Sequence, residues 1–124
     1  METAQLSVLY QLAGRIASRK RSVALKIYIA GKITGDDGYR AKFQEATKNL
    51  EALGHVVLNP AILPAGLAEQ DYMQIALAML NAADLAVFLP DYQESAGAMI
   101  EWAWCKRTGK NCALYMNMKG GGIG

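Results

Sequence analysis

The 124-residue sequence has little of what metal centres and disulfide frameworks require. It contains one histidine, His55, and two cysteines, Cys105 and Cys112, which stand in apolar surroundings. Because no group of cysteines and histidines has the spacing of zinc ligands, we expect no metal site and no other cofactor. Two isolated cysteines do not indicate a disulfide framework either, and a reducing cytoplasm is the expected location.

The sequence also lacks long apolar runs and a strong charge of either sign. No apolar stretch reaches the roughly 20 residues that a membrane span needs. The 13 basic residues exceed the 11 acidic ones by only two, and about half of the basic residues lie in the first 32 positions. Without a dense basic patch over the remaining sequence, we expect neither a nucleic-acid partner nor a membrane partner.

Half of the residues are apolar and a fifth are charged, which is typical of one globular domain with a single core. Residues 1–25 differ from the rest because they are basic and place Leu6, Leu9 and Ile16 at helical spacing. Such a segment is typical of an extra helix, a transit peptide or a membrane-surface helix. The short apolar stripe favours an extra N-terminal helix. Residues 119–124 form a glycine-rich tail, for which we expect little structure.

Short apolar runs alternate with segments of helical periodicity along residues 26–118. Strands are expected at residues 26–31, 55–60, 84–91 and 111–117, and helices at residues 39–53, about 71–83, and 95–108. Strands that are apolar at nearly every position predict a parallel sheet that is covered on both faces. With right-handed crossovers, the sequence predicts a single-domain, doubly wound α/β fold of the Rossmann or flavodoxin-like type, with four or five strands.

This topology places a ligand site beyond the carboxyl ends of the strands, where the connections diverge. The loops at those ends are residues 30–38, 59–66 and 90–97, and they contain much of the glycine, proline and short polar residues. We therefore expect these loops to meet at one crevice, with Asp91 pointing into it.

One charge interrupts an apolar helix near the third of these loops. Glu101 is the single charged residue between Ala96 and Cys105, and Gly97 and Ala98 lie one turn before it on the same helix face. Small side chains at those positions leave space in which a ligand can reach the carboxylate. The alternative is a glutamate on the solvent face, which is where most helical glutamates lie.

Two further residues favour a polar site at this edge. Ser95 is expected to cap the helix, and the free N–H groups of the first turn favour an anion. Tyr28 lies within an aliphatic strand, so its ring is expected to be buried and its hydroxyl needs a partner. That partner is either a carboxylate across the strand ends or a backbone carbonyl.

The order and spacing of these motifs resemble the nucleoside 2-deoxyribosyltransferase-like family. The resemblance runs from "IYIAGKITG" through "GHVVLNP" and "AADLAVFLPD" to "SAGAMIE", and covers about residues 26–116. The sequence is most similar to the small, largely uncharacterised and often phage-encoded branch of that family.

The resemblance implies an enzyme that hydrolyses or transfers the N-glycosidic bond of a 2-deoxynucleoside or its 5′-monophosphate. It implies Glu101 as the nucleophile at C1′, Tyr28 as the residue that orients Glu101, and Asp91 as a carboxylate near the base. It also implies a homodimer or larger homo-oligomer. The residues that it assigns to binding of the substrate and its phosphate are Gly31, Lys32, Ile33, Gly35, Asn59, Ser95, Gly97 and Ala98.

The sequence departs from the family pattern at one position. Ala76 stands where active relatives carry an aspartate, so the acid that protonates the leaving base is missing. This departure favours a second interpretation, in which the domain binds nucleotides without catalysis, as a sensor or a sequestering protein.

Overall fold

The computed structural model describes residues 24–115, and within them it shows a four-stranded sheet in the order β2-β1-β3-β4. The strands are β1 (Lys26–Ala30), β2 (Val56–Leu58), β3 (Leu85–Phe88) and β4 (Cys112–Leu114). All neighbouring strands are parallel, and Ile27 pairs with Val57 on one side and Leu85 on the other. The predicted doubly wound α/β fold is confirmed. The expected N-terminal helix and the glycine-rich tail lie outside the described residues.

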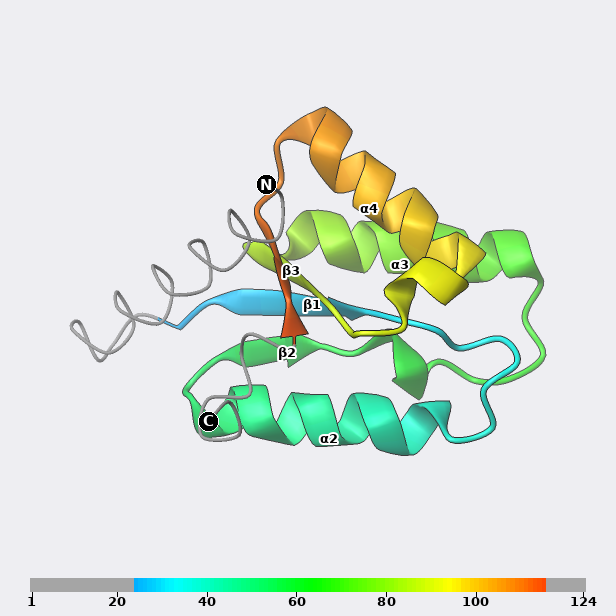
Figure 1. Cartoon of the computed structure of the whole chain (residues 1–124), viewed down its shortest axis with the longest axis horizontal. Helices are drawn as coiled ribbons and strands as arrows, with labels where there is room; N and C mark the ends of the chain where they lie inside the picture. The colour runs from blue at the N-terminus through cyan, green and yellow to red at the C-terminus, as the bar shows by residue number, and fades with distance from the viewer. Residues whose placement is uncertain (1–23, 116–124) are drawn as a thin grey trace.

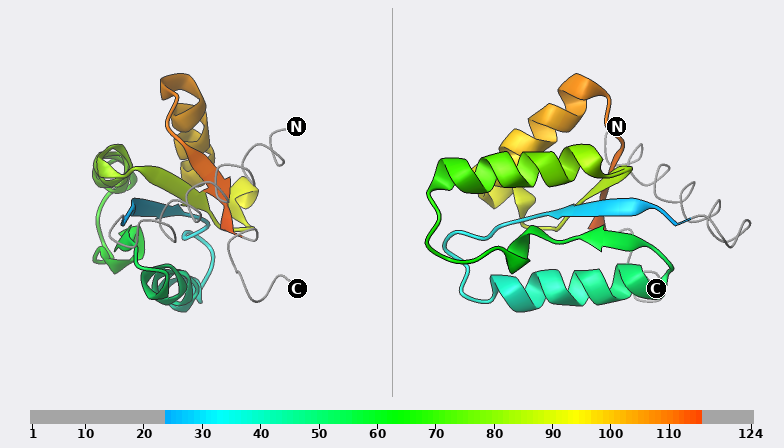
Figure 2. Two further views of the ribbon diagram at one scale, coloured as in Figure 1. Left: turned by 90° about the vertical axis from the view of Figure 1, so that its left-hand side faces the viewer. Right: turned by 180° about the vertical axis from the view of Figure 1, so that it is seen from behind.

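In the described part of the chain, three helices cover the two faces of the sheet (Figure 1). Helix α2 (Tyr39–Ala52) lies on one face, and α3 (Glu69–Ala82) and α4 (Ala96–Thr108) lie on the other (Figure 2). None of the described helices is long and apolar enough to cross a membrane.

Alternate side chains of β1 enter the two layers, as the pleat of a strand requires. Ile27 and Ile29 pack with Phe43 and Leu50 on the α2 side. Tyr28 belongs to the other core, on the side of α3 and α4. The position of Tyr28 in the strand therefore directs its ring toward the layer that contains Glu101.

The chain turns in opposite directions after β1 and after β3, which are adjacent in the sheet. The connection from β1 crosses through α2 to β2, and the connection from β3 crosses through α4 to β4. This divergence at the carboxyl ends is the place where open α/β sheets bind ligands. Two short 3-10 helices, η1 (Pro60–Ile62) and η2 (Tyr92–Glu94), lie in the connecting segments.

Candidate active site

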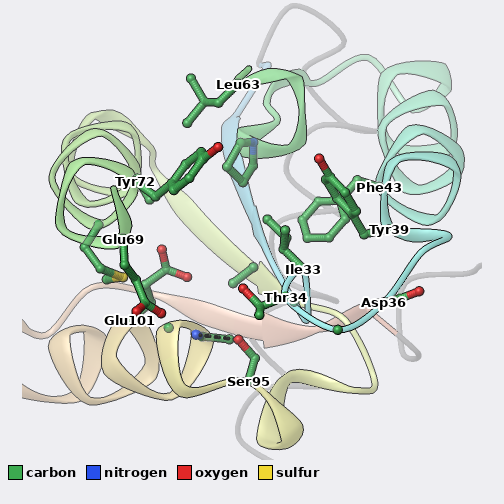
Figure 3. Close-up of a pocket in the computed structure, with 18 of the residues that line it drawn as sticks. Ile33, Thr34, Asp36, Tyr39, Phe43, Leu63, Glu69, Tyr72, Ser95 and Glu101 are labelled. Atoms are coloured by element: carbon green, nitrogen blue, oxygen red, sulfur yellow. Dashed lines mark hydrogen bonds between the residues drawn. The ribbon is translucent and has the colours of Figure 1, made fainter. Parts of the chain in front are cut away.

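A cavity of about 470 Å³ opens at this switch point, which is a size typical of small-molecule sites (Figure 3). Its walls come from the end of β1 and the loop after it, the start of α2, the segment from η1 into α3, and the first turns of α4. The three loops that the sequence predicted to meet therefore all contribute to one cavity.

Glu101 lies in the wall of this cavity and is only 4% exposed. The alternative of a glutamate on the solvent face is therefore excluded. Gly97 and Ala98 line the cavity together with Glu101, as the spacing on one helix face predicted. Burial raises the pKa of the Glu101 carboxyl to about 7, although a hydrogen bond from Tyr28 acts in the opposite direction. The carboxyl therefore titrates near neutral pH and not in the acidic range of an exposed glutamate.

The Tyr28 hydroxyl donates a hydrogen bond to Oε2 of Glu101 over 2.5 Å. Tyr28 is 1% exposed, and burial followed by the neighbouring carboxylate raises its pKa well above the ordinary value. The tyrosine consequently stays protonated and acts as the donor. Within the described residues, Oε1 of Glu101 has no hydrogen-bond partner, so this oxygen is available to a ligand.

The start of α4 provides the polar rim beside Glu101. Ser95 is the N-cap, and its Oγ accepts a hydrogen bond from the Ala98 N–H over 3.1 Å, as predicted (Figure 3). The N–H groups of Ala96 and Gly97 donate to no acceptor in residues 24–115. They are suited to a ligand oxygen, because the N-terminus of a helix presents unsatisfied donors and partial positive charge.

The structure brings most of the predicted site residues together around the cavity. Those that line it are Tyr28, Gly31, Ile33, Gly35, Ser95, Gly97, Ala98 and Glu101. Three of the predicted residues, Lys32, Asn59 and Asp91, do not line it. Asn59 is buried and caps η1, where its Oδ1 accepts from the Ala61 N–H over 2.9 Å.

Asp91 faces a lysine and not the cavity, contrary to the prediction that it points into the crevice. Its carboxylate accepts from the backbone N–H of Lys32 over 3.1 Å and is paired with the ammonium of Lys42. The same ammonium lies 2.5 Å from Asp36 and 2.9 Å from the carbonyl oxygen of Lys32. Asp91 thus fastens the loop after β1 to the loop after β3, and Lys32 Nζ lies 3.4 Å from Glu94 outside the cavity.

One wall of the cavity was not predicted, although its helical spacing is readable in the sequence. Glu69, Tyr72, Met73 and Ala76 follow one another at i, i+3, i+4 and i+7 and present one face of α3 to the cavity. Ala76 is buried in this wall, so the missing acid leaves an apolar surface beside the cavity. The carboxylate on this face is Glu69, in the first turn of the helix.

The segment between η1 and α3 forms the opposite lip and is held from both sides. From α3, the Tyr72 hydroxyl donates to the Pro64 carbonyl over 2.5 Å. From α2, the Arg40 guanidinium donates to the carbonyls of Ala61 and Leu63 over 3.0 and 3.4 Å. The lip is therefore fixed by side chains that come from outside the segment.

Comparison with known proteins gives a family and a fold. The family model described as Domain of unknown function (DUF4406) matches residues 25–114. A solved structure of a 2-deoxyribosyltransferase from the psychrotolerant bacterium Bacillus psychrosaccharolyticus has a TM-score of 0.58 to this chain at 21% sequence identity. The similarity covers 72% of this chain and 70% of that chain, and it shows a shared fold. No curated protein sequence matches this chain.

Proposed function

The chain belongs to the DUF4406 family, and we propose that it cleaves the N-glycosidic bond of a 2-deoxynucleoside or its 5′-monophosphate. The observation that carries this proposal is the pair of Tyr28 and Glu101 in the wall of the cavity. A buried carboxylate with one free oxygen, held by a neutral donor, has the geometry of a nucleophile. The shared fold with a 2-deoxyribosyltransferase supports the same class of reaction.

In the proposed reaction, Oε1 of Glu101 attacks C1′ of the deoxyribose while the bond from C1′ to the base nitrogen breaks. The base leaves with the bonding electrons and takes up a proton from solvent water, and the sugar remains bonded through C1′ to Glu101 as a glycosyl ester. Water then attacks C1′ as the bond to Glu101 breaks, loses a proton to solvent, and leaves deoxyribose, or deoxyribose 5-phosphate from a monophosphate substrate; alternatively a second base attacks C1′ and a new nucleoside or nucleotide forms. Tyr28 holds the carboxylate in place and stabilises it when the ester is released.

The N–H groups of Ala96 and Gly97 are proposed to bind a sugar or phosphate oxygen. They stand at the start of the helix that carries Glu101, and Gly97 lines the same cavity as Glu101, which supports a sugar position that reaches the carboxylate. Gly31, Ile33 and Gly35 are proposed to contact the substrate from the loop after β1. Asp91 and Lys32 are proposed to act indirectly, through the position of this loop.

The cleavage is tested by incubating the protein with a panel of 2-deoxynucleosides and their 5′-monophosphates and following free base by chromatography. Wild type is expected to release base, and Glu101→Ala is expected to lose this activity. Equal release by the two proteins, or release by neither, contradicts the proposal.

A second function, nucleotide binding without cleavage, is favoured by one observation. Ala76 places a methyl group, and no acid, in the cavity wall that contains Glu101. Stabilisation of the protein by nucleosides or nucleotides in a thermal unfolding assay, without release of base, is the result expected from this second function.

A further inference from the structure

The charged side chains that line the cavity are all acidic. Four carboxylates line it, those of Asp36, Asp37, Glu69 and Glu101. In the part of the chain that the structure describes, no lysine, arginine or histidine lines it. Figure 3 shows Glu69 and Glu101 on one side of the cavity and Asp36 on the other. The lining of the cavity is therefore acidic.

Two of these carboxylates, at the exposed mouth of the cavity, have no compensating cation within the described residues. Asp36 is paired with Lys42 over 2.5 Å, and this hydrogen bond lowers the pKa of Asp36. Asp37 and Glu69 are exposed, and within residues 24–115 neither forms an ion pair or a hydrogen bond through its side chain. Their charges are free to act on a ligand at the mouth.

The cations on the bordering segments are held by other groups. Lys42 lies between Asp36 and Asp91, and Lys32 is paired with Glu94. Arg40 donates to two backbone carbonyls of the lip. None of these three side chains is among those that line the cavity, so the described site contains no cation to bind a phosphate.

From this distribution, and resting on the proposed function, we infer that the site takes the uncharged 2-deoxynucleoside and discriminates against its 5′-monophosphate, with Asp37 and Glu69 as specificity-determining residues. The free N–H group of Gly97, which lines the cavity, and that of the adjacent Ala96 then donate to the oxygen of a sugar hydroxyl.

The effect of the helix N-terminus on phosphate binding can be compared with the effect of the carboxylates. A helix N-terminus improves the binding of an anion by about two- to five-fold at an exposed site and by up to about 30-fold at a partly buried one. For an assumed separation of roughly 8 Å in water, one carboxylate weakens the binding of a phosphate with a charge near −1.8 by about five-fold. Two carboxylates at that separation weaken it by about 25-fold, which offsets the attraction of the helix N-terminus, and the described lining has no cation to add to that attraction.

The test compares a 2-deoxynucleoside with the 5′-monophosphate of the same base, by kcat/KM for base release and by Kd from calorimetry. Wild type is expected to prefer the nucleoside in both measurements. In the double variant Asp37→Asn/Glu69→Gln, the ratio between the two ligands is expected to shift toward the monophosphate by about 10- to 25-fold at low salt. The shift is expected to shrink at high ionic strength, since salt screens exposed charges.

The matched control is the double variant Glu45→Gln/Glu51→Gln, which removes the same charge from exposed positions of α2 that do not line the cavity. Its ratio is expected to equal that of wild type. A wild-type preference for the monophosphate, equal ratios in the two double variants, or binding of neither ligand overturns the inference. If no base is released but the Kd values still favour the nucleoside over the monophosphate, the proposed cleavage is wrong and the inference about ligand selectivity stands.

Discussion

Replacement of Tyr28 by phenylalanine tests how the site controls its carboxylate. The substitution removes the hydroxyl that donates to Glu101 over 2.5 Å and keeps the buried ring. Burial already raises the pKa of Glu101 to about 7, and the hydrogen bond from Tyr28 lowers it against this effect. Loss of the donor therefore raises the pKa of Glu101 further, in the direction that protonates the nucleophile.

The size of this change follows from the strength of the bond. A hydrogen bond to a charged group contributes about 1.5–3 kcal/mol, which corresponds to about one or two pKa units. The wild-type carboxylate is close to half ionised at pH 7, since its pKa is about 7. An upward shift of about one unit leaves roughly a tenth ionised, so the rate at pH 7 is expected to fall about five-fold from ionisation alone.

The assay is the pH dependence of kcat for base release. Wild type is expected to lose activity as the pH falls through about 7, because the nucleophile becomes protonated. In Tyr28→Phe this acid limb is expected to move to higher pH, and activity is expected to recover in part at alkaline pH.

The matched control is Tyr39→Phe, which removes a hydroxyl from the same cavity. Within the described residues, that hydroxyl makes no hydrogen bond. An acid limb at the same pH in wild type and Tyr28→Phe refutes the reasoning, whatever the height of the plateau.

Two further changes test burial and close packing at the site. Glu101→Gln is expected to stabilise the fold above pH 7 by up to about 3 kcal/mol and to have little effect near pH 4, as measured by urea unfolding. The reason is that the pKa of Glu101 is about 7 in the folded protein against an ordinary value of 4.5, so the wild type loses stability as the pH rises through this window. An equal difference in stability at both pH values contradicts the burial argument. Gly31→Ala is expected to lower the free energy of unfolding by about 1–3 kcal/mol, since the added methyl group would lie 2.8 Å from Leu89 Cδ1. Gly97→Ala is expected to leave the free energy of unfolding unchanged, because the nearest side-chain atom is Met73 Sδ at 3.5 Å. Equal losses in the two variants contradict the packing argument.

The fold was predictable because the sequence agrees with it at several levels. The strands are almost uniformly apolar, and the helices between them have a clear period and end near glycines such as Gly54 and Gly109. The pair of Tyr28 and Glu101 was also predictable, because a buried hydroxyl requires a hydrogen-bond partner and a single carboxylate in an apolar helix is a candidate for that partner.

The direction of loop side chains was not predictable in the same way. Asp91 follows a strand end, but its carboxylate turns toward Lys42, which lies 49 residues earlier in the sequence. Helix periodicity cannot predict such ion pairs, because they depend on how two loops and α2 are arranged in space. The prediction for Asp91 failed for that reason.

The contribution of Glu69 to the cavity wall was missed because the start of the helix was placed at about residue 71. Asp71 does cap the helix, but from within the first turn, where its carboxylate accepts from the Ala68 N–H over 3.3 Å. The helix begins at Glu69, and this shift brings Glu69 onto the face that carries Tyr72 and Ala76. An acidic residue serves as a cap at more than one position, so the sequence left the boundary open.

The most direct test of the account is a search for the covalent intermediate on Glu101. The protein is mixed with a 2-deoxynucleoside, quenched in acid at short times and digested, and the peptide that contains Glu101 is examined by mass spectrometry. If Glu101 is the nucleophile, a fraction of this peptide carries one deoxyribosyl group in the wild-type protein and none does in Glu101→Gln. Release of base without any modified peptide at Glu101, or a deoxyribosyl group on another residue, contradicts the assignment of Glu101 as the nucleophile.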